Sequence, residues 1–105
     1  MIRQPDFVTP EVFEVAKAAL AKKKPALDFS AARLSRFAEG LCAQILHTGS
    51  YDNEPETIEV LERYVSESGY RIDITDKRRH HEIYLNNPQK TAPDKLKTVI
   101  RHPIK

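Results

Sequence analysis

A segment near the C-terminus, Arg79–Pro88, most narrows what this chain can fold into, because its pattern is that of a β-strand with a charged centre. Side chains alternate between the two faces of a strand. One face is apolar enough to meet helices and is formed by His81, Ile83 and Leu85. The other presents an imidazole, a carboxylate and a phenol, from His80, Glu82 and Tyr84. A carboxylate among aromatic groups either pairs with a cation or loses hydration, and in both cases it can serve a ligand.

Two other segments have the features of helices. Thr9–Glu11 combines a hydroxyl N-cap, a proline at the first helical position and an acid, and predicts a helix to about Lys24. A second helix is predicted with Asn53 as N-cap, Glu56 completing a capping box and Gly69 as the C-terminal cap. The expected apolar stripes are Val12, Phe13, Ala16, Ala19 and Leu20 in the first helix and Ile58, Leu61 and Val65 in the second.

The remaining pattern predicts strands and short connections. A hairpin is expected from two strands that flank Glu39-Gly40, namely Arg33–Phe37 and Leu41–Thr48. The other expected segments are a strand end at Met1–Arg3, an extended stretch at Arg71–Asp76, a solvated basic loop at Lys77–Arg79, a short helix at Thr91–Lys97 and a last strand at Val99–Ile104. We therefore predict an α+β fold, an antiparallel sheet with two main helices on one face. The helices should meet Ile45, Ile83, Leu85 and Ile100 or Val99.

Length and composition predict a single globular domain over residues 1–105, with room for one modest core. A net charge of +2 gives no strong attraction to nucleic acid or to a membrane surface. No apolar run reaches the ~18 residues of a membrane span. The single cysteine, Cys42, cannot form an internal disulfide, which favours a reducing cytoplasm.

Several interpretations of the candidate residues stay open at this point. Glu82 can be a structural partner of Arg101 or of a lysine on a neighbouring strand. His80 and Glu82 could ligate a metal only if His47 or His102 converged with them, and we expect no metal site and no cofactor. Cys42 lies in an apolar strand, where cysteine is commonly a small core residue rather than a nucleophile.

Four stretches resemble the GyrI-like small-molecule-binding family: Met1–Phe7, Gly40–Asp52, His80–Leu85 and Thr91–Val99. The resemblance covers nearly the whole chain and implies one strand–helix–strand–strand unit of that fold plus an N-terminal helix. The chain resembles the C-terminal half of longer free-standing members, which repeat the unit and bind ligands between the halves. The resemblance therefore implies either a homodimer or a complement that supplies the missing N-terminal half.

The family resemblance also implies a function, which is binding of small amphipathic, often cationic or planar, molecules by a sensor or sequestering protein. Its groove has a central Glu and aromatic walls. On this chain the Glu is Glu82, Tyr51 and Tyr84 are wall residues, and His80 lies beside them. A first alternative is a hydrolase that opens strained cyclopropane rings of DNA-alkylating compounds, with Glu82 as general base and Tyr51 as a second catalytic candidate. A second alternative is a protein-interaction domain.

Overall fold

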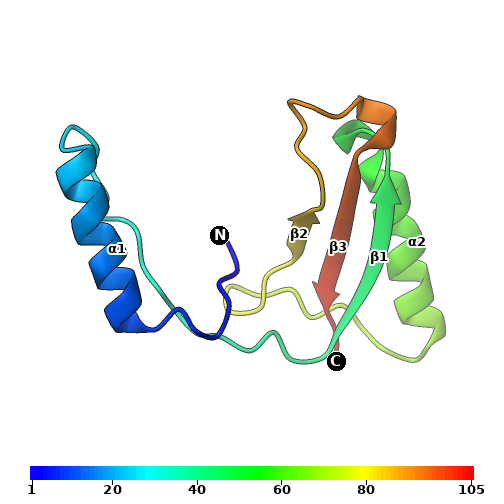
Figure 1. Ribbon diagram of the computed structural model, residues 1–105. Coiled ribbons are helices and arrows are strands. Elements are labelled where there is room, and N and C mark those ends of the chain that lie inside the picture. The colour runs from blue at the N-terminus through cyan, green and yellow to red at the C-terminus, as the bar shows by residue number, and fades with distance from the viewer. The chain divides into compact units, whose positions relative to one another are not determined.

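The computed structural model of the protein describes residues 1–105 and divides into two units, residues 1–37 and 38–105. The first unit contains helix α1 (Pro10–Lys23), drawn in blue in Figure 1, and confirms the predicted helix. Thr9 is its N-cap, and the Oγ1 of Thr9 accepts a hydrogen bond from the backbone N–H of Val12 at 3.3 Å. Met1–Arg3 has no strand structure, so that prediction is wrong. A strand needs a neighbour for its hydrogen bonds, and this segment pairs with none.

The second unit is a three-stranded antiparallel sheet with one helix on it (Figure 1). In chain order its elements are β1 (Cys42–Thr48), the 3-10 turn η1 (Tyr51–Asn53), α2 (Glu54–Glu67), β2 (His81–Tyr84), the 3-10 turn η2 (Pro93–Lys95) and β3 (Lys97–Pro103). The last strand of the chain, β3, lies between the other two in the order β1-β3-β2. The predicted α+β class is thereby confirmed.

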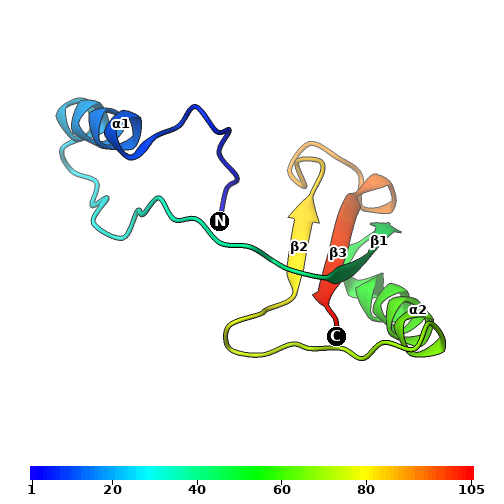
Figure 2. The ribbon, with the colours of Figure 1, turned by 90° about the horizontal axis from the view of Figure 1, so that it is seen from below.

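Helix α2 packs on one face of the sheet and forms the core. The buried apolar residues are Leu61, Val65, Ile100 and Ile104, with Ala43, Ile45, Ile58 and Ile72 packed against them. The predicted stripe of α2 is therefore the one that the sheet buries. Figures 1 and 2 agree that α2 lies along β1 and away from β2. The helix consequently leaves the β2 side of this face uncovered. Because α1 belongs to the other unit, its place in the predicted helix layer stays a prediction.

Helix α2 begins and ends close to the predicted positions. Asn53 is the N-cap residue, but its side chain makes no capping hydrogen bond, so the predicted capping box with Glu56 is absent. Gly69 follows the helix with φ of +83°, a conformation that glycine adopts without a steric penalty. The backbone N–H of Tyr70 then donates to the carbonyl of Val65 at 3.1 Å, which closes a Schellman-type end.

The strand register determines which side chains share a face with α2. Ile100 of β3 lies opposite Ile45 of β1 and Glu82 of β2. Directly opposite residues of antiparallel strands project to the same face, so Glu82 lies on the helix side of the sheet. The alternation predicted for β2 is correct, but the choice of face is reversed. For α2, the expected contacts with Ile83 and Leu85 are wrong, because these residues project to the opposite face, whereas the expected contacts with Ile45 and Ile100 are confirmed.

The predicted hairpin of Arg33–Phe37 with Leu41–Thr48 is also wrong. Residues 33–37 have no regular secondary structure, and β1 pairs with β3 instead. Gly40 does have a positive φ, of +71°, as a tight turn would require. Near it, however, the carbonyls of Glu39 and Leu41 accept hydrogen bonds from Arg78, at 3.1 and 2.8 Å, rather than pairing with a preceding strand. A side chain that is distant in sequence has taken the acceptors that a turn would use.

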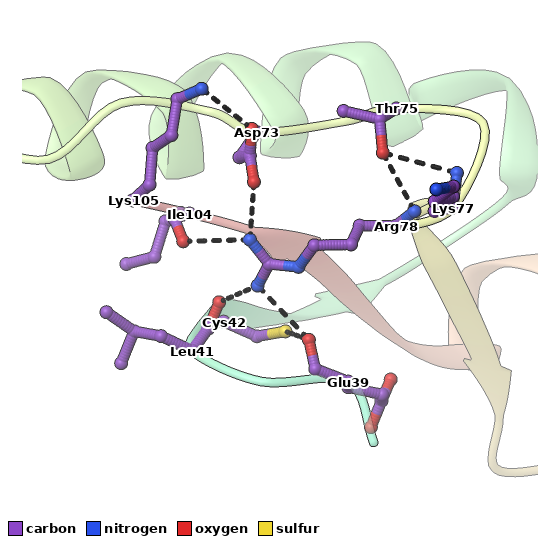
Figure 3. Close-up of polar contacts among 9 residues, drawn as sticks. All are labelled: Glu39, Leu41, Cys42, Asp73, Thr75, Lys77, Arg78, Ile104 and Lys105. Carbon is purple, nitrogen blue, oxygen red and sulfur yellow. Dashed lines mark hydrogen bonds and ion pairs between the residues drawn. The ribbon is translucent and has the colours of Figure 1, made fainter. Parts of the chain in front are cut away.

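Arg78 is bonded to several chain segments, which corrects the prediction of a solvated loop at this residue, whereas Lys77 and Arg79 are exposed as predicted (Figure 3). The Arg78 guanidinium also donates to Asp73 Oδ2 at 2.5 Å and to the carbonyl of Ile104 at 3.3 Å. Five donors in a planar fork allow arginine to join several chain segments in this way. Arg78 thus ties the β1 entrance and the C-terminal segment to the loop before β2.

Candidate functional site

Glu82 lies at the centre of a polar surface on the helix side of β2 that α2 does not cover. We call it the His80–Glu82 surface, and it is formed by His80, Glu82, Tyr84 and Tyr51. The Glu82 side chain is 26% exposed. Its Oε2 accepts a hydrogen bond from the Tyr84 hydroxyl at 2.8 Å, and its Oε1 is 3.8 Å from His80 Nε2. Arg101, the predicted structural partner, projects to the other face and pairs with Glu39 instead. The alternative in which Glu82 pairs with Arg101 is therefore wrong.

Two tyrosine rings meet beside this carboxylate. The ring centroids of Tyr51 and Tyr84 are 5.6 Å apart, with an angle of 57° between the ring planes. This is a tilted geometry that aromatic pairs favour. The hydrogen bond to Glu82, followed by burial, raises the pKa of Tyr84 to about 12. Tyr84 therefore remains a protonated donor at neutral pH. Both tyrosines are more than a third exposed, so their rings remain accessible to a ligand.

The turn between β1 and α2 positions Tyr51. Gly49 has φ of +132°, and its N–H donates to the carbonyl of Leu96 at 2.9 Å. The buried ring of His47 joins both ends of this turn, with Nδ1 2.7 Å from Thr57 Oγ1 and Nε2 2.8 Å from the Ser50 carbonyl. A carbonyl only accepts, so Nε2 carries the proton. With both nitrogens occupied, His47 supports the turn and has no position left for a metal.

Glu54 belongs to the same surface and was not predicted from the sequence. It is the first residue of α2 and only 7% exposed. Its Oε1 is buried and has no hydrogen-bond partner. Burial and then the nearby Glu82 carboxylate raise the pKa of Glu54. The sequence signal was the acid just after the Gly-x-Tyr segment, but an acid at that place is also typical of an ordinary helix start.

His102 was named from the sequence only as a conditional metal ligand with His80 and Glu82, and its burial was not predicted. Its side chain is 2% exposed, and neither ring nitrogen has a hydrogen-bond partner. Its ring centroid lies 5.5 Å from that of His80. Burial, and to a smaller extent His80, lower the pKa of His102. His102 is therefore a neutral residue beneath the polar surface. A histidine in a β-strand carries no sequence signal that distinguishes this role from exposure.

The opposite face of β2 carries a separate, fully paired cluster. Glu39 Oε1 is 2.5 Å from His81 Nδ1, and Glu39 Oε2 accepts from the Arg101 guanidinium at 2.6 Å. Arg101 Nε also donates to Gln44 Oε1 at 3.0 Å. Cys42 also projects to this face, and its thiol donates to the Glu39 carbonyl at 3.7 Å. The cysteine thus lies apart from the His80–Glu82 surface and has no contact that activates a nucleophile.

Neither a metal centre nor a membrane span is formed by these residues. The structure contains no group of three or more His, Cys, Asp or Glu side chains arranged to hold a metal ion. Its helices are too short or too polar to cross a lipid bilayer. The His80–Glu82 surface instead offers a carboxylate, a hydroxyl donor and two aromatic rings. Such a set suits binding of a planar cation by charge attraction and ring contact.

Comparisons with known proteins bear on the family and the fold of the chain. Residues 31–105 match the model of the GyrI-like small molecule binding domain. No curated protein matches the chain. Among solved structures, a hydrolase from Listeria innocua is 44% identical, with a TM-score of 0.91 over 98% of this chain and 52% of its own. An uncharacterized conserved protein from the same organism is 46% identical, with a TM-score of 0.94 over 98% of this chain and 50% of its own. The chain therefore spans about half the length of these relatives.

Proposed function

The chain belongs to the GyrI-like small-molecule-binding family, and on that premise we propose that it binds planar amphipathic cations at Glu82 as a sensor or sequestering protein. The observation that carries the proposal is the Glu82 carboxylate between His80 and the paired rings of Tyr51 and Tyr84. No arginine or lysine pairs with this carboxylate. A bound cation would supply the missing positive charge, and the rings would contact its planar faces.

Thermal-shift and fluorescence titrations with a planar aromatic monocation, ethidium, test this function. We expect ethidium to raise the melting temperature of the parent protein and to bind at least about tenfold more weakly to Glu82→Gln, because a charge-assisted contact is lost. Glu56→Gln is the matched control, since Glu56 is an exposed acid in the first turn of α2. The proposal fails if Glu82→Gln and Glu56→Gln bind ethidium as tightly as the parent.

The fold of Glu82→Gln provides a second criterion. Because Glu82 makes no ion pair with a lysine or arginine, removing its charge should leave the melting temperature equal to that of the parent or slightly higher. A structural carboxylate would behave in the opposite way, with a clear loss of stability. A lower melting temperature together with unchanged ethidium binding would remove Glu82 from the site.

We propose further that residues 1–105 act as one half-length domain, and that a second copy supplies the other half of the binding groove. Two features support this: the relatives are about twice as long, and strand β2, which carries Glu82, is an edge strand of the sheet. An edge strand has free backbone groups that a second strand can pair with. Sedimentation at micromolar concentration should show a dimer, and ethidium should increase the dimer fraction. A monomer with and without ethidium would contradict this arrangement.

Hydrolysis of strained cyclopropane rings is the second candidate function, favoured by the hydrolase from Listeria innocua that is 44% identical. In such a reaction Glu82 takes a proton from water, and the water oxygen bonds to a ring carbon. The ring C–C bond breaks, and its electron pair is protonated by the acid form of a neighbouring group, for which the Tyr84 hydroxyl lies 2.8 Å from Glu82. Incubation of a cyclopropane-fused dienone in H2-18O should give a ring-opened alcohol that carries the label. Glu82→Gln should abolish its formation.

A further inference from the structure

Glu54 differs from every other acid of the second unit in combining burial with an unpaired oxygen. It is 7% exposed, and its Oε1 has no partner although the atom is inaccessible to solvent. An ionised carboxylate in that position would lack the hydrogen bonds that stabilise its charge. The side chain therefore requires either a proton of its own or a cation brought by a ligand.

The groups that face Glu54 do not include a permanent cation. Tyr51, three residues before Glu54, has its ring 5.6 Å from that of Tyr84. The Tyr84 hydroxyl donates to Glu82 of β2, so the start of α2 lies beside the Glu82 carboxylate. Tyr84 of the same strand, His80 before it and His47 of β1 complete the set of titratable neighbours. His47 is already engaged with Thr57 and Ser50. Burial and then the Glu82 carboxylate raise the pKa of Glu54, and no lysine or arginine is paired with Glu54 to offset them.

We propose that Glu54 is a second carboxyl group of the ligand surface, and that Glu54 and Glu82 hold one shared proton that a bound cation displaces. This inference rests on the proposed function. Without ligand the pair carries one negative charge. When a monocation binds at Glu82, the O–H bond of the pair breaks, the proton leaves to the buffer, and the negative charge of the buried Glu54 carboxylate adds to that of Glu82 beneath the ligand. The total charge is conserved, because the proton that leaves carries the charge that the second carboxylate gains.

This arrangement would make the affinity for cations depend on pH. Where the pair is protonated before binding and ionised after it, affinity rises by up to about tenfold per pH unit, which corresponds to one released proton. Glu54→Gln keeps the shape of the side chain and its hydrogen-bonding capacity but has no proton to release. Glu56→Gln, about half a helical turn away on the exposed surface, leaves the pair intact and is the control.

Calorimetry of ethidium binding in buffers with different ionisation enthalpies measures the released protons directly. For the parent and for Glu56→Gln we expect net release, up to about one proton per ethidium, and an affinity that increases with pH. For Glu54→Gln we expect release near zero and an affinity independent of pH. Equal release by the parent and Glu54→Gln, or no release by the parent, overturns the inference even if ethidium binds at Glu82.

A measurement without ligand keeps the inference testable if ethidium does not bind. In that case the proposed function fails, and titration of the glutamate carboxyl carbons by 13C NMR tests the shared proton alone. We expect Glu54 to titrate above the ordinary glutamate range, and its curve to move back toward that range in Glu82→Gln. A Glu54 curve within the ordinary range, or one unchanged by Glu82→Gln, overturns the shared proton.

Discussion

The two faces of strand β2 carry residues of similar chemistry in opposite electrostatic situations. On the face away from α2, the Glu39 carboxylate is bonded to His81 and Arg101 through contacts of 2.5 and 2.6 Å. On the helix face, Glu82 is held by a tyrosine hydroxyl, and Glu54 has an unpaired buried oxygen. A carboxylate supplied with fixed cations stabilises the fold. One without fixed cations remains available to a ligand at some loss of stability.

The largest expected effect on stability concerns Arg78, whose guanidinium donates to the carbonyl of Glu39, the residue at the centre of the paired cluster. Arg78→Met should lower the free energy of unfolding by about 2–3 kcal/mol, because Asp73 loses a partner and three carbonyls lose a donor. Urea denaturation measures the effect. Lys77→Met is the control, since Lys77 is exposed, and should change stability by less than about 0.5 kcal/mol. Similar losses in the two variants would show that the arginine contacts are not structural.

Glu39→Gln should have the next largest effect and should depend on pH. Burial alone would raise the pKa of Glu39, but His81 and Arg101 outweigh it, so the pKa lies below its ordinary value of 4.5. The charge therefore stabilises the fold above pH 4.5, and this contribution is lost as the pH falls through the lowered pKa. We expect Glu39→Gln to be less stable by about 1–2 kcal/mol at pH 7. The difference should disappear in urea titrations well below pH 4.

Glu54→Gln should change the free energy of unfolding in the opposite direction, by raising it. The raised pKa means that the folded protein holds the Glu54 proton more tightly than the unfolded chain. Stability therefore falls as the pH rises from the ordinary value of 4.5 through the raised pKa. At pH 7 we expect Glu54→Gln to be more stable than the parent by about 1 kcal/mol, and to lose that advantage near pH 4. A destabilised Glu54→Gln at pH 7 would place Glu54 with the paired carboxylates.

The smallest expected effect concerns His102. Its lowered pKa means that the unfolded chain binds a proton more readily, so stability falls as the pH decreases below 6.5. Between pH 7.5 and 5.5 we expect a loss of roughly 0.5–1 kcal/mol in the parent that His102→Leu does not show. Thermal melts across this range measure the slope. Because the chain holds three other histidines, the comparison is between the slopes of the two proteins.

The sequence predicted well those elements that depend on local signals. The start of α1 and the end of α2 follow from Thr9-Pro10 and Gly69, whose effects act within one helical turn. Helix α2 does begin directly after Asn53, although the Asn53 side chain makes no capping hydrogen bond. The alternation of β2 also followed from local pattern. Its choice of face did not, because the face depends on α2 packing over β1 and β3. The apolar pair Ile83 and Leu85 indicated a core that the helix does not reach.

The candidate site was predictable only in part, for the same reason. Glu82, Tyr84 and His80 were predicted together because they alternate on one strand, and the family resemblance added Tyr51. Glu54 and His102 come near them only through the turn after β1 and the pairing of β3. Arg78 likewise contacts segments up to 39 positions away in the chain. Contacts between residues so far apart in the chain produce no periodic pattern in the local sequence from which they could be predicted.

The alternation of β2 has a consequence for how such a protein can change over evolutionary time. His81 ties the strand to Glu39 on the face away from α2, whereas residues 80, 82 and 84 occupy the face toward α2. Under the proposed function, substitutions at those three positions would change ligand preference while the contact between His81 and Glu39 persists. Lineages that inherit this strand would then diversify in the molecules they recognise while keeping that contact.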